Sequence, residues 1–578
     1  MPQFDARSPL SAVLATPEGR AILEEHAPEL FASPAAFHLA EFPLRSLLNL
    51  TLGDDDPRPA DIVERVSTID DPRPVADEEP AIDADRSYEA PTVLPGSAAV
   101  TLPDRAHRHQ QVEVELRGPS HGNPFVDVEV SATFTSNGEA VWVGGFYDGD
   151  GRYLLRFLPP TAGTWHFTTT STARSLDGVR GVVQVEDSTH PGPVRVADGF
   201  HFAYADGTAY RPIGTTAYVW THQGQELEDQ TLGALRDSPF TKVRMCLFPK
   251  DFLYNSNEPE RFVWEQDADG AFDTTRFDVE YWHHLERRIG QLGDLGIEAD
   301  LILFHPYDRW GFSRQSRAAD DRYVRYLVRR LSAFPNVWWS LANEYDLMPS
   351  KRPEDWDRIA HLIKAEDHVG HLLSVHNWLE IWDYASPWAT HCSIQAGEQL
   401  AKKVTSWRRR WGKPVLVDEC GYEGDIDQGW GSLTGEEMVR RFWEVMLSGG
   451  YATHGETFDD PDEILWWSKG GVLHGESADR LKFLRRIVEE SPTGRLDPQP
   501  SDWDCAWGGE AGKYLVLYFG ANRPSFRDVV IPVGMAAEID VIDTWGMTIE
   551  TRPGVHSGAV RVDLPARPYT AIRLRAVT

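Results

Sequence analysis

The chain has little cysteine and no long apolar run. Its 578 residues include four cysteines, and these show neither CxxC spacing nor the dense pattern of a disulfide framework. We therefore expect reduced, mostly buried thiols. No stretch approaches 18 uninterrupted apolar residues, so a membrane-spanning helix is not expected.

Basic residues are also scarce. Lys and Arg total 57 against 89 Asp and Glu, a formal charge of −32. Binding to nucleic acid or to an anionic membrane depends on clustered Lys and Arg, so neither partner is expected. The first residues lack a basic segment followed by an apolar one, which predicts a cytoplasmic location.

Changes in periodicity divide the chain into parts. Residues 1–70 have apolar residues at helical spacing, which predicts a small helical module for packing or oligomerisation. Residues 71–95 are rich in Asp, Glu and Pro and are expected to be a linker. Period-two alternation over 96–195, and again over 497–578, predicts two β-sandwiches. A homo-oligomer through the helical module or a β-sandwich is one possible assembly.

Between residues 199 and 495, strands alternate with amphipathic helices, which is typical of a parallel sheet built from βα units. Eight strands are expected, at 210–216, 242–248, 298–304, 337–341, 372–376, 391–394, 415–418 and 451–456. Eight such units fit a (β/α)8 TIM barrel. A doubly wound open sheet is the alternative, but no Gly-rich phosphate loop follows the first strand. The predicted fold class is multidomain α/β, a TIM barrel flanked by N-terminal and C-terminal β-sandwiches.

Two glutamates end two of these strands. Glu344 closes the run Asn-Val-Trp-Trp-Ser-Leu-Ala-Asn-Glu, and Glu419 closes Pro-Val-Leu-Val-Asp-Glu. Reacting groups in a barrel come from the carboxyl ends of strands, and retaining glycoside hydrolysis needs two carboxylates there. Two alternatives stay open. Glu344 could cap a following helix, and Asp418 competes with Glu419 because alternate strand residues point to opposite sides.

Other polar and aromatic residues also lie near strand ends. Arg244 is inside an otherwise apolar strand, and a buried charge needs a partner, so we expect it to serve Glu419. Further candidate substrate contacts are His305, Asp308, Trp310, Trp220, Trp378, His391, Glu456 and Trp467. Each has a structural alternative: the tryptophans could pack in the core, the histidines could be structural, and Glu456 could pair with an arginine.

A metal site is the weaker interpretation of the histidines at the barrel rim. Four of them could contribute, namely His305, His376, His391 and His454. No spacing such as HExxH supports a metal, so we expect neither metal nor cofactor.

The dipeptide Asn343-Glu344 on strand four, paired with Glu419 on strand seven, resembles the clan A glycoside hydrolases, with cellulase-like and apiosidase-like bacterial barrels as the nearest kin. The resemblance implies that Glu344 is the acid/base and Glu419 the nucleophile. It also implies that Asn343 hydrogen-bonds the sugar 2-hydroxyl and that Arg244 and His305 line the site.

Two departures from the clan pattern affect the sugar contacts. A tyrosine that often contacts the nucleophile near strand six is replaced here by His391-Cys392-Ser393. Where the clan often has a stacking tryptophan at strand eight, this chain has Gly455-Glu456, and Trp466 and Trp467 follow about ten residues later. Upstream, segments such as His-Gly-Asn-Pro-Phe at 121–125 resemble a bacterial module that directly precedes such barrels.

These observations predict a retaining, exo-acting glycoside hydrolase that acts on a small glycoside or oligosaccharide, with a β-glycoside as the first expectation. An α-L-arabinofuranosidase or apiosidase is the alternative within the same chemistry. A sugar-binding barrel without hydrolysis is the alternative outside it, although such a protein would be expected to lose one glutamate. A phosphate-dependent barrel would need a Gly-rich anion loop after strands seven and eight, and none stands there.

Overall fold

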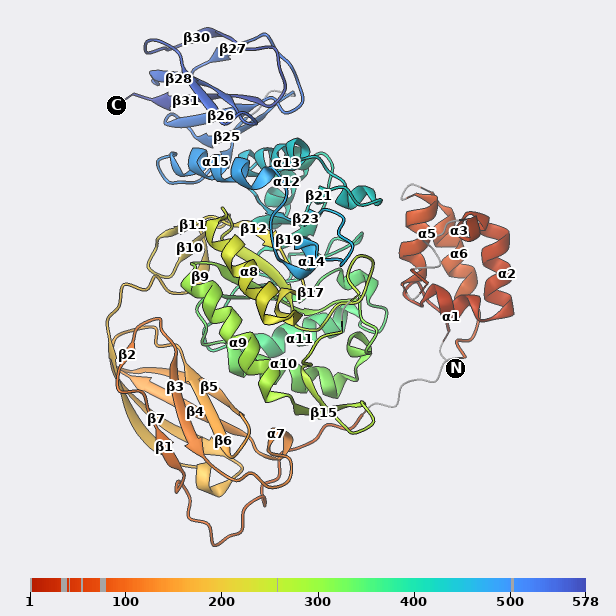
Figure 1. The fold of residues 1–578 in the computed structure, drawn as a ribbon, viewed down its shortest axis with the longest axis vertical. Coiled ribbons are helices and arrows are strands. Elements are labelled where there is room, and N and C mark those ends of the chain that lie inside the picture. The colour runs from red at the N-terminus through yellow and green to blue at the C-terminus, as the bar shows by residue number, and fades with distance from the viewer. Residues whose placement is uncertain are drawn as a thin grey trace.

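The computed structural model describes residues 3–32, 39–40, 42–53, 56–72, 79–256, 258–500 and 504–577. A barrel occupies the middle of the molecule, one β-sandwich lies at each end, and the helical module lies beside the barrel (Figure 1). The predicted fold class is therefore confirmed. Within the described ranges, no helix combines the length and the apolar character that crossing a membrane requires.

The helical module packs its apolar faces into one small core. Its described helices are α1 (Leu10–Leu14), α2 (Pro17–His26), α3 (Pro28–Ala32), α5 (Leu44–Leu52) and α6 (Arg58–Val66). Thr16 caps α2 by accepting the Gly19 N–H at 3.2 Å, and Pro17 is the first helical residue, the order that favours a helix start. The module core also includes Leu347 of the barrel, so the module is docked on the barrel.

The linker expected at 71–95 is only partly described, because 73–78 lie outside the described residues. Residues 79–95 form neither helix nor strand. They are nevertheless attached: Glu89 accepts from the Ser175 N–H and hydroxyl at 2.6 and 2.8 Å. Their second half therefore follows the surface of the N-terminal sandwich.

The N-terminal sandwich has the strand order β1-β3-β6-β5-β4-β7-β8-β2. Its strands are β1 (Ala99–Thr101), β2 (Ala106–His107), β3 (Val112–Arg117), β4 (Val130–Ser136), β5 (Glu139–Tyr147), β6 (Arg152–Phe157), β7 (Gly163–Ser171) and β8 (Arg180–Glu186). The first part of β5 pairs with β4 and its last three residues pair with β6, so this strand joins the two layers. Alternate residues of β3 and β4 are buried, as period-two patterning predicts.

The barrel strands run in the order β18-β17-β16-β13-β12-β22-β20-β19, and all neighbours are parallel. They are β12 (Ile213–Thr216), β13 (Lys242–Cys246), β16 (Glu298–Phe304), β17 (Val337–Ala342), β18 (Leu373–Ser374), β19 (Cys392–Gln395), β20 (Val415–Glu419) and β22 (Tyr451–His454). A parallel bridge between His376 and Ser393 spans the remaining gap between β18 and β19. The barrel is thus nearly closed.

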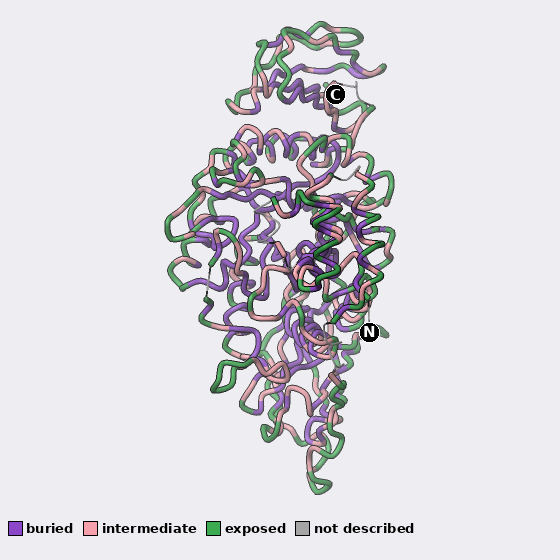
Figure 2. Tube along the Cα trace, turned by 90° about the vertical axis from the view of Figure 1, so that its right-hand side faces the viewer, coloured by how far each residue is buried: buried purple, intermediate pink, exposed green. Residues whose placement is uncertain are grey.

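Helices surround the barrel, and short strands in its flanking and connecting segments form small separate sheets. The helices are α8 (Gln225–Asp237), α9 (Val279–Asp294), α10 (Arg317–Leu331), α11 (Pro353–Glu366), α12 (Leu400–Trp411), α13 (Gly435–Leu447), α14 (Trp466–Lys469) and α15 (Ser477–Glu489). Strands β9 (Val194–Ala197), β10 (His201–Tyr204) and β11 (Ala209–Tyr210) lead into the barrel, and β14 (Trp264–Gln266) with β15 (Phe272–Phe277) forms a hairpin after β13. Buried residues gather in the interior of the barrel, and the outer loops are exposed (Figure 2).

The C-terminal sandwich packs beside α13 and α15 (Figure 1). Its larger sheet contains β24 (Asp497–Pro498), β25 (Ala506–Glu510), β26 (Tyr514–Tyr518), β31 (Thr570–Ala576), β28 (Ala537–Asp543) and β29 (Thr548–Thr551), and its smaller sheet pairs β27 (Phe526–Val530) with β30 (Ala559–Asp563). Three of the four cysteines, Cys246, Cys392 and Cys420, are buried thiols in the barrel.

Buried ion pairs hold the N-terminal sandwich against the barrel. Glu286 of α9 accepts from Arg156 of β6 at 2.6 and 3.0 Å, and from Arg330 of α10 at 2.6 Å. Arg330 also donates to Asp148 of the sandwich at 2.7 Å. All four side chains are buried and paired. Separating the two domains would leave these charges without their partners, so the ion pairs favour the joined arrangement.

Candidate active site

Glu344 and Glu419 share one pocket at the carboxyl ends of the barrel strands. Both are buried, and both line a cavity of about 610 Å³. Glu344 lies two residues after β17, with Asn343 between them, and has a left-handed backbone with φ of 50°. A non-glycine residue held in this region stores about 1–3 kcal/mol of strain, and such strain gathers at functional sites.

Three side chains from other strands hold the Glu419 carboxylate. Tyr218, two residues after β12, donates its hydroxyl to Glu419 Oε1. His376 Nε2 lies 3.3 Å from the same oxygen, and Arg244 Nη1 lies 3.9 Å from it. Burial alone would raise the pKa of Glu419, but the adjacent His376 ring, the Arg244 charge and the Tyr218 hydrogen bond outweigh it and lower that pKa. Glu419 is therefore an ionised carboxylate.

Arg244 also connects this carboxylate to Asn343. Its Nη2 donates to Asn343 Oδ1 at 3.1 Å, and the Tyr218 hydroxyl lies 3.2 Å from the same oxygen. Arg244 thus lies within ion-pair distance of Glu419, as expected, and its hydrogen bond also positions Asn343. The Asn343 amide nitrogen stays available to the pocket, which Asn343 lines.

Asp418, the competitor of Glu419, is turned into the barrel interior. It accepts from Lys242 Nζ at 2.7 Å, Ser393 at 2.6 Å and Thr453 at 2.7 Å. Burial opposes ionisation, but Lys242 and Arg244 hold the pKa of Asp418 well below its usual range. Alternation along β20 therefore separates a structural aspartate from the pocket glutamate.

Glu344 has the opposite electrostatic character. Tyr307, three residues after β16, donates to Glu344 Oε2, and the Gln395 amide nitrogen lies 3.0 Å from Oε1 in the orientation that satisfies its hydrogen bonds. Burial and the charge of Glu419 raise the pKa of Glu344 to about 8. Near neutral pH this residue is a protonated acid beside an ionised carboxylate.

Lys250 is a pocket residue that sequence reasoning missed. Its ammonium lies 4.1 Å from the ring centroids of Tyr218 and Trp467 and 4.4 Å from that of Tyr307. Burial lowers the pKa of Lys250 to about 8. The aromatic faces stabilise its positive charge, which also opposes the rise in the pKa of Glu344.

Several predicted residues lie together at this pocket. Asn343, Glu344, Glu419, Trp378 and Trp467 line it, and Arg244 contacts Asn343 from the barrel interior. Trp378 is placed by the loop after β18, because Asp346 accepts the N–H groups of residues 378, 379 and 380 at 2.6–2.9 Å.

Two predicted residues belong to the protein interior instead. Trp220 is fully buried in the main apolar core. His305 is buried with Nε2 3.1 Å from the Phe248 carbonyl, and burial lowers its pKa to about 3, so the ring is neutral. Neither residue is among those that line the pocket, because each side chain is buried in the protein interior.

Four further predicted residues lie away from the two glutamates. His391 precedes β19, so it is at the amino end of the barrel, where it contacts the rings of Phe202 and Trp338. Asp308 accepts the N–H groups of Trp310, Gly311 and Ser313 and stabilises its own loop. Trp310 packs on Phe262 and Phe312, and Glu456 accepts the N–H groups of His474 and Gly475.

One cluster of ligand-type side chains lies outside the pocket. Ligand atoms of Glu423, His454 and Glu456 lie within 4.8 Å of one another, and all three residues are buried. Both carboxylates already accept backbone N–H groups near the start of α15. The four histidines considered from the sequence do not form such a group among the described residues.

The residues that sequence reasoning missed share one signal. Tyr218, Lys250 and Tyr307 all follow the carboxyl end of a barrel strand within four residues, as does His376, which the sequence offers as a candidate metal ligand. Position after a strand could have singled them out. Residue type could not, because tyrosine and lysine are common in loops.

The chain is similar to known proteins over most of its length. Residues 198–493 match the family described as Apiosidase-like, catalytic domain, while residues 105–172 and 503–575 match two domains of unknown function, DUF5060 and DUF5605. No protein with a curated description matches the sequence significantly.

Solved structures give the same result. A protein from Bacteroides vulgatus described as a candidate glycoside hydrolase is 35% identical, with a TM-score of 0.78, over 82% of this chain and 100% of that chain. A family 5 glycoside hydrolase from the same organism is 17% identical, with a TM-score of 0.53, over 67% of this chain and 94% of that chain, and it shows likeness of fold. The chain thus belongs to the apiosidase-like family and is a clan A glycoside hydrolase with a TIM-barrel catalytic domain.

Proposed function

We propose that the enzyme is a retaining glycosidase that works by double displacement, with Glu419 as nucleophile and Glu344 as acid/base. The observation that carries this proposal is the pair of opposite pKa shifts in one pocket. An ionised carboxylate can attack an anomeric carbon, while a protonated one beside it can give a proton to the leaving oxygen.

The reaction then proceeds in two steps. Glu419 attacks as Glu344 protonates the leaving group, which gives a covalent glycosyl-enzyme. That bond removes the charge of Glu419, so the pKa of Glu344 falls and Glu344 becomes the base that activates water. Asn343 is positioned by Arg244 to donate its amide to a sugar hydroxyl. The retaining mechanism needs a carboxylate separation of about 5–5.5 Å.

An exo-acting mode is supported by the aromatic residues that line the pocket near Glu419. Tyr218, Tyr422, Trp430 and Trp467 all line this side, and the Trp430 and Trp467 ring centroids are 5.2 Å apart. Aromatic residues from loops after strands one, seven and eight thus surround the place where one sugar ring would lie.

We propose a β-glycoside as substrate. The name of the matching family supports an apiosidase-type pentofuranosidase as the second candidate. A cytoplasmic location stays a prediction.

Product stereochemistry and active-site substitution test this proposal together. Aryl glycosides of different sugars identify the sugar that is cleaved, and NMR of the first product should show the anomeric configuration of the substrate. Glu419→Gln should reduce kcat by about 10⁴-fold or more, because the nucleophile is lost. Glu380→Gln, which neutralises an exposed carboxylate near the pocket, is the matched control and should stay active. An inverted product, or full turnover by Glu419→Gln, would refute the mechanism.

A further inference from the structure

The helical module forms one wall of the catalytic pocket. Leu39, Phe42 and Leu50 of the module line the same cavity as Glu344 and Glu419. None of the family matches covers these residues, since they begin at residue 105. The pocket of this chain therefore includes a surface that the matched domains do not supply.

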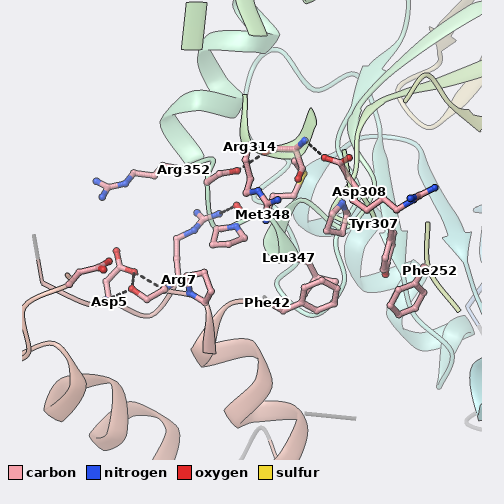
Figure 3. A pocket seen from close by; sticks show the side chains of 18 of the residues that line it. Asp5, Arg7, Phe42, Phe252, Tyr307, Asp308, Arg314, Leu347, Met348 and Arg352 are labelled. Carbon is pink, nitrogen blue, oxygen red and sulfur yellow. Dashed lines mark hydrogen bonds between the residues drawn. The ribbon is translucent and has the colours of Figure 1, made fainter. Parts of the chain in front are cut away.

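The module covers the side of the pocket that holds Glu344. The Phe42 ring meets the Tyr307 ring edge-on with centroids 6.1 Å apart, and Tyr307 donates to Glu344. Leu347, three residues after Glu344, belongs to the module core, and Trp378 packs against that core. Figure 3 shows Phe42 reaching from the module toward Leu347 and Tyr307. No described module residue contacts Tyr218 or Trp467 on the Glu419 side in the aromatic or core contacts.

This placement decides which part of a substrate meets the module. A protonated acid/base must lie beside the oxygen of the leaving group, whereas the nucleophile lies on the other face of the sugar. A glycoside bound between the two glutamates therefore directs its leaving group toward the Glu344 side. The module wall lies there.

The chemistry of that wall is apolar. The three module residues face Phe252, Leu253 and Leu347 of the barrel, with Trp378 beside them. Leu50 and Leu253 are 49% and 41% exposed although they line a pocket. Such side chains gain from contact with an apolar ligand, and they offer no hydrogen bond to a sugar.

The wall is held in place by polar contacts outside the pocket. Arg7 of the module donates to the Lys351 carbonyl at 2.6 Å and to the Met348 carbonyl at 3.4 Å, and Figure 3 shows the Arg7 side chain directed toward Met348. A second pocket of about 490 Å³ adjoins the first and shares Phe42, Phe252, Tyr307 and Leu347 with it. A bulky leaving group therefore has space beyond the apolar wall.

We propose that the helical module builds the leaving-group site of this enzyme, and that the site selects glycosides with an apolar aryl or alkyl aglycone. This inference rests on the proposed function for the direction in which the leaving group departs.

Two substrates of one sugar separate the leaving-group site from the sugar site. A 4-methylumbelliferyl glycoside carries a large flat aglycone, whereas the glycosyl fluoride of the same sugar carries none. Leu50→Ser should reduce kcat/KM for the aryl glycoside about tenfold and leave the value for the fluoride within about twofold. The same substitution at Leu94, which is 73% exposed outside the pocket, is the matched control and should change neither value.

Binding of free 4-methylumbelliferone, measured by calorimetry, distinguishes failure of this inference from failure of the proposed function. If the wild type cleaves no glycoside, the proposed function fails, and weaker binding of this phenol by Leu50→Ser would still support the apolar site. If Leu50→Ser behaves like the wild type toward the aryl glycoside and the phenol, the inference is overturned. Equal losses on the aryl glycoside and the fluoride would overturn it too, because the residue would then act on the sugar site.

Discussion

The side chains around Glu419 show how the site makes one glutamate different from its partner. Tyr218, His376 and Arg244 come from strands one, five and two and converge on one carboxylate. Glu344 receives a tyrosine hydroxyl and an amide, and no described cation lies within ion-pair distance of it. Since burial penalises charge on both residues, the difference in partners decides which one ionises.

Tyr218→Phe should move the acidic limb of the pH profile of kcat/KM to higher pH. The Tyr218 hydroxyl helps to lower the pKa of Glu419, and its loss should raise that limb by about one to two pH units. The alkaline limb, which reports loss of the Glu344 proton, should move less. Phenylalanine keeps the ring beside Lys250, so packing is retained.

Tyr210→Phe is the matched control for this experiment. Tyr210 is also buried, but its hydroxyl donates to the Thr241 carbonyl at 2.8 Å at the amino end of the barrel. Its substitution should leave both limbs unchanged. An unmoved acidic limb in Tyr218→Phe would mean that this hydroxyl does not set the ionisation of Glu419.

At the scale of elements, each part of a barrel strand has its own role. Charged residues within the strands stabilise the barrel interior, and residues just past the strand ends form the pocket. Lys242, Asp300 and Asp418 pair inside the barrel, while residues just past the strand ends face the pocket. Strand β16 begins with a buried glutamate, Glu298, whose carboxyl group has no ion-pair partner among the described residues. Glu298 is buried, its partner is the Trp338 indole N–H at 3.0 Å, and burial raises its pKa to about 8.

Glu298→Gln should stabilise the protein at high pH. The folded-state pKa of Glu298 lies above that of the unfolded chain, so the folded state binds more protons between pH 4.5 and 8 and loses stability as pH rises. Glutamine keeps the acceptor for Trp338 without the charge. Urea unfolding should give the variant about 1–2 kcal/mol more free energy of unfolding than the wild type at pH 9, and no gain at pH 4. A less stable variant at pH 9 would contradict the assignment.

At the scale of the whole molecule, contacts between domains complete both the fold and the pocket. The N-terminal sandwich is joined to the barrel through Glu286, which Arg156 and Arg330 approach from the two domains. Burial alone would raise the pKa of Glu286, but these two arginines lower it to about 2. The carboxylate is thus charged because both domains are present.

Glu286→Gln should destabilise the sandwich and the barrel together. Removing one member of a buried ion network leaves the arginines without their charge partner and costs about 3–5 kcal/mol. The folded-state pKa is depressed, so the wild type holds this stabilisation above about pH 4.5 and loses it as pH falls toward 2. The difference between variant and wild type in calorimetric unfolding should therefore shrink in acid.

Glu129→Gln is the comparison that isolates burial at this boundary. Its pair with Arg329 also joins the sandwich to α10, at 2.8 Å, but the Glu129 side chain is 45% exposed. An exposed pair contributes about 0–1 kcal/mol, so this substitution should have little effect. If the two substitutions lowered the free energy of unfolding equally, burial of Glu286 would not be the reason for the large contribution of its ion pairs.

The sequence by itself determined the barrel, both sandwiches and the two glutamates, because periodicity and strand-end position are local properties of the chain. It also placed Asn343, Arg244, Trp378 and Trp467. Local pattern could not show that Trp220 and His305 are buried in the interior or that His391 lies at the amino end of the barrel. These positions depend on how the strands and helices pack together.

Only the tertiary structure showed which side chains keep Glu419 charged and what closes the pocket. The ionisation of Glu419 needs side chains from strands one, two and five, which lie up to 201 residues away in the chain. The wall formed by Phe42 and Leu50 needs a module that the sequence presents as a separate packing unit. Electrostatic and apolar contacts act through space, so they exist only once distant segments have been brought together.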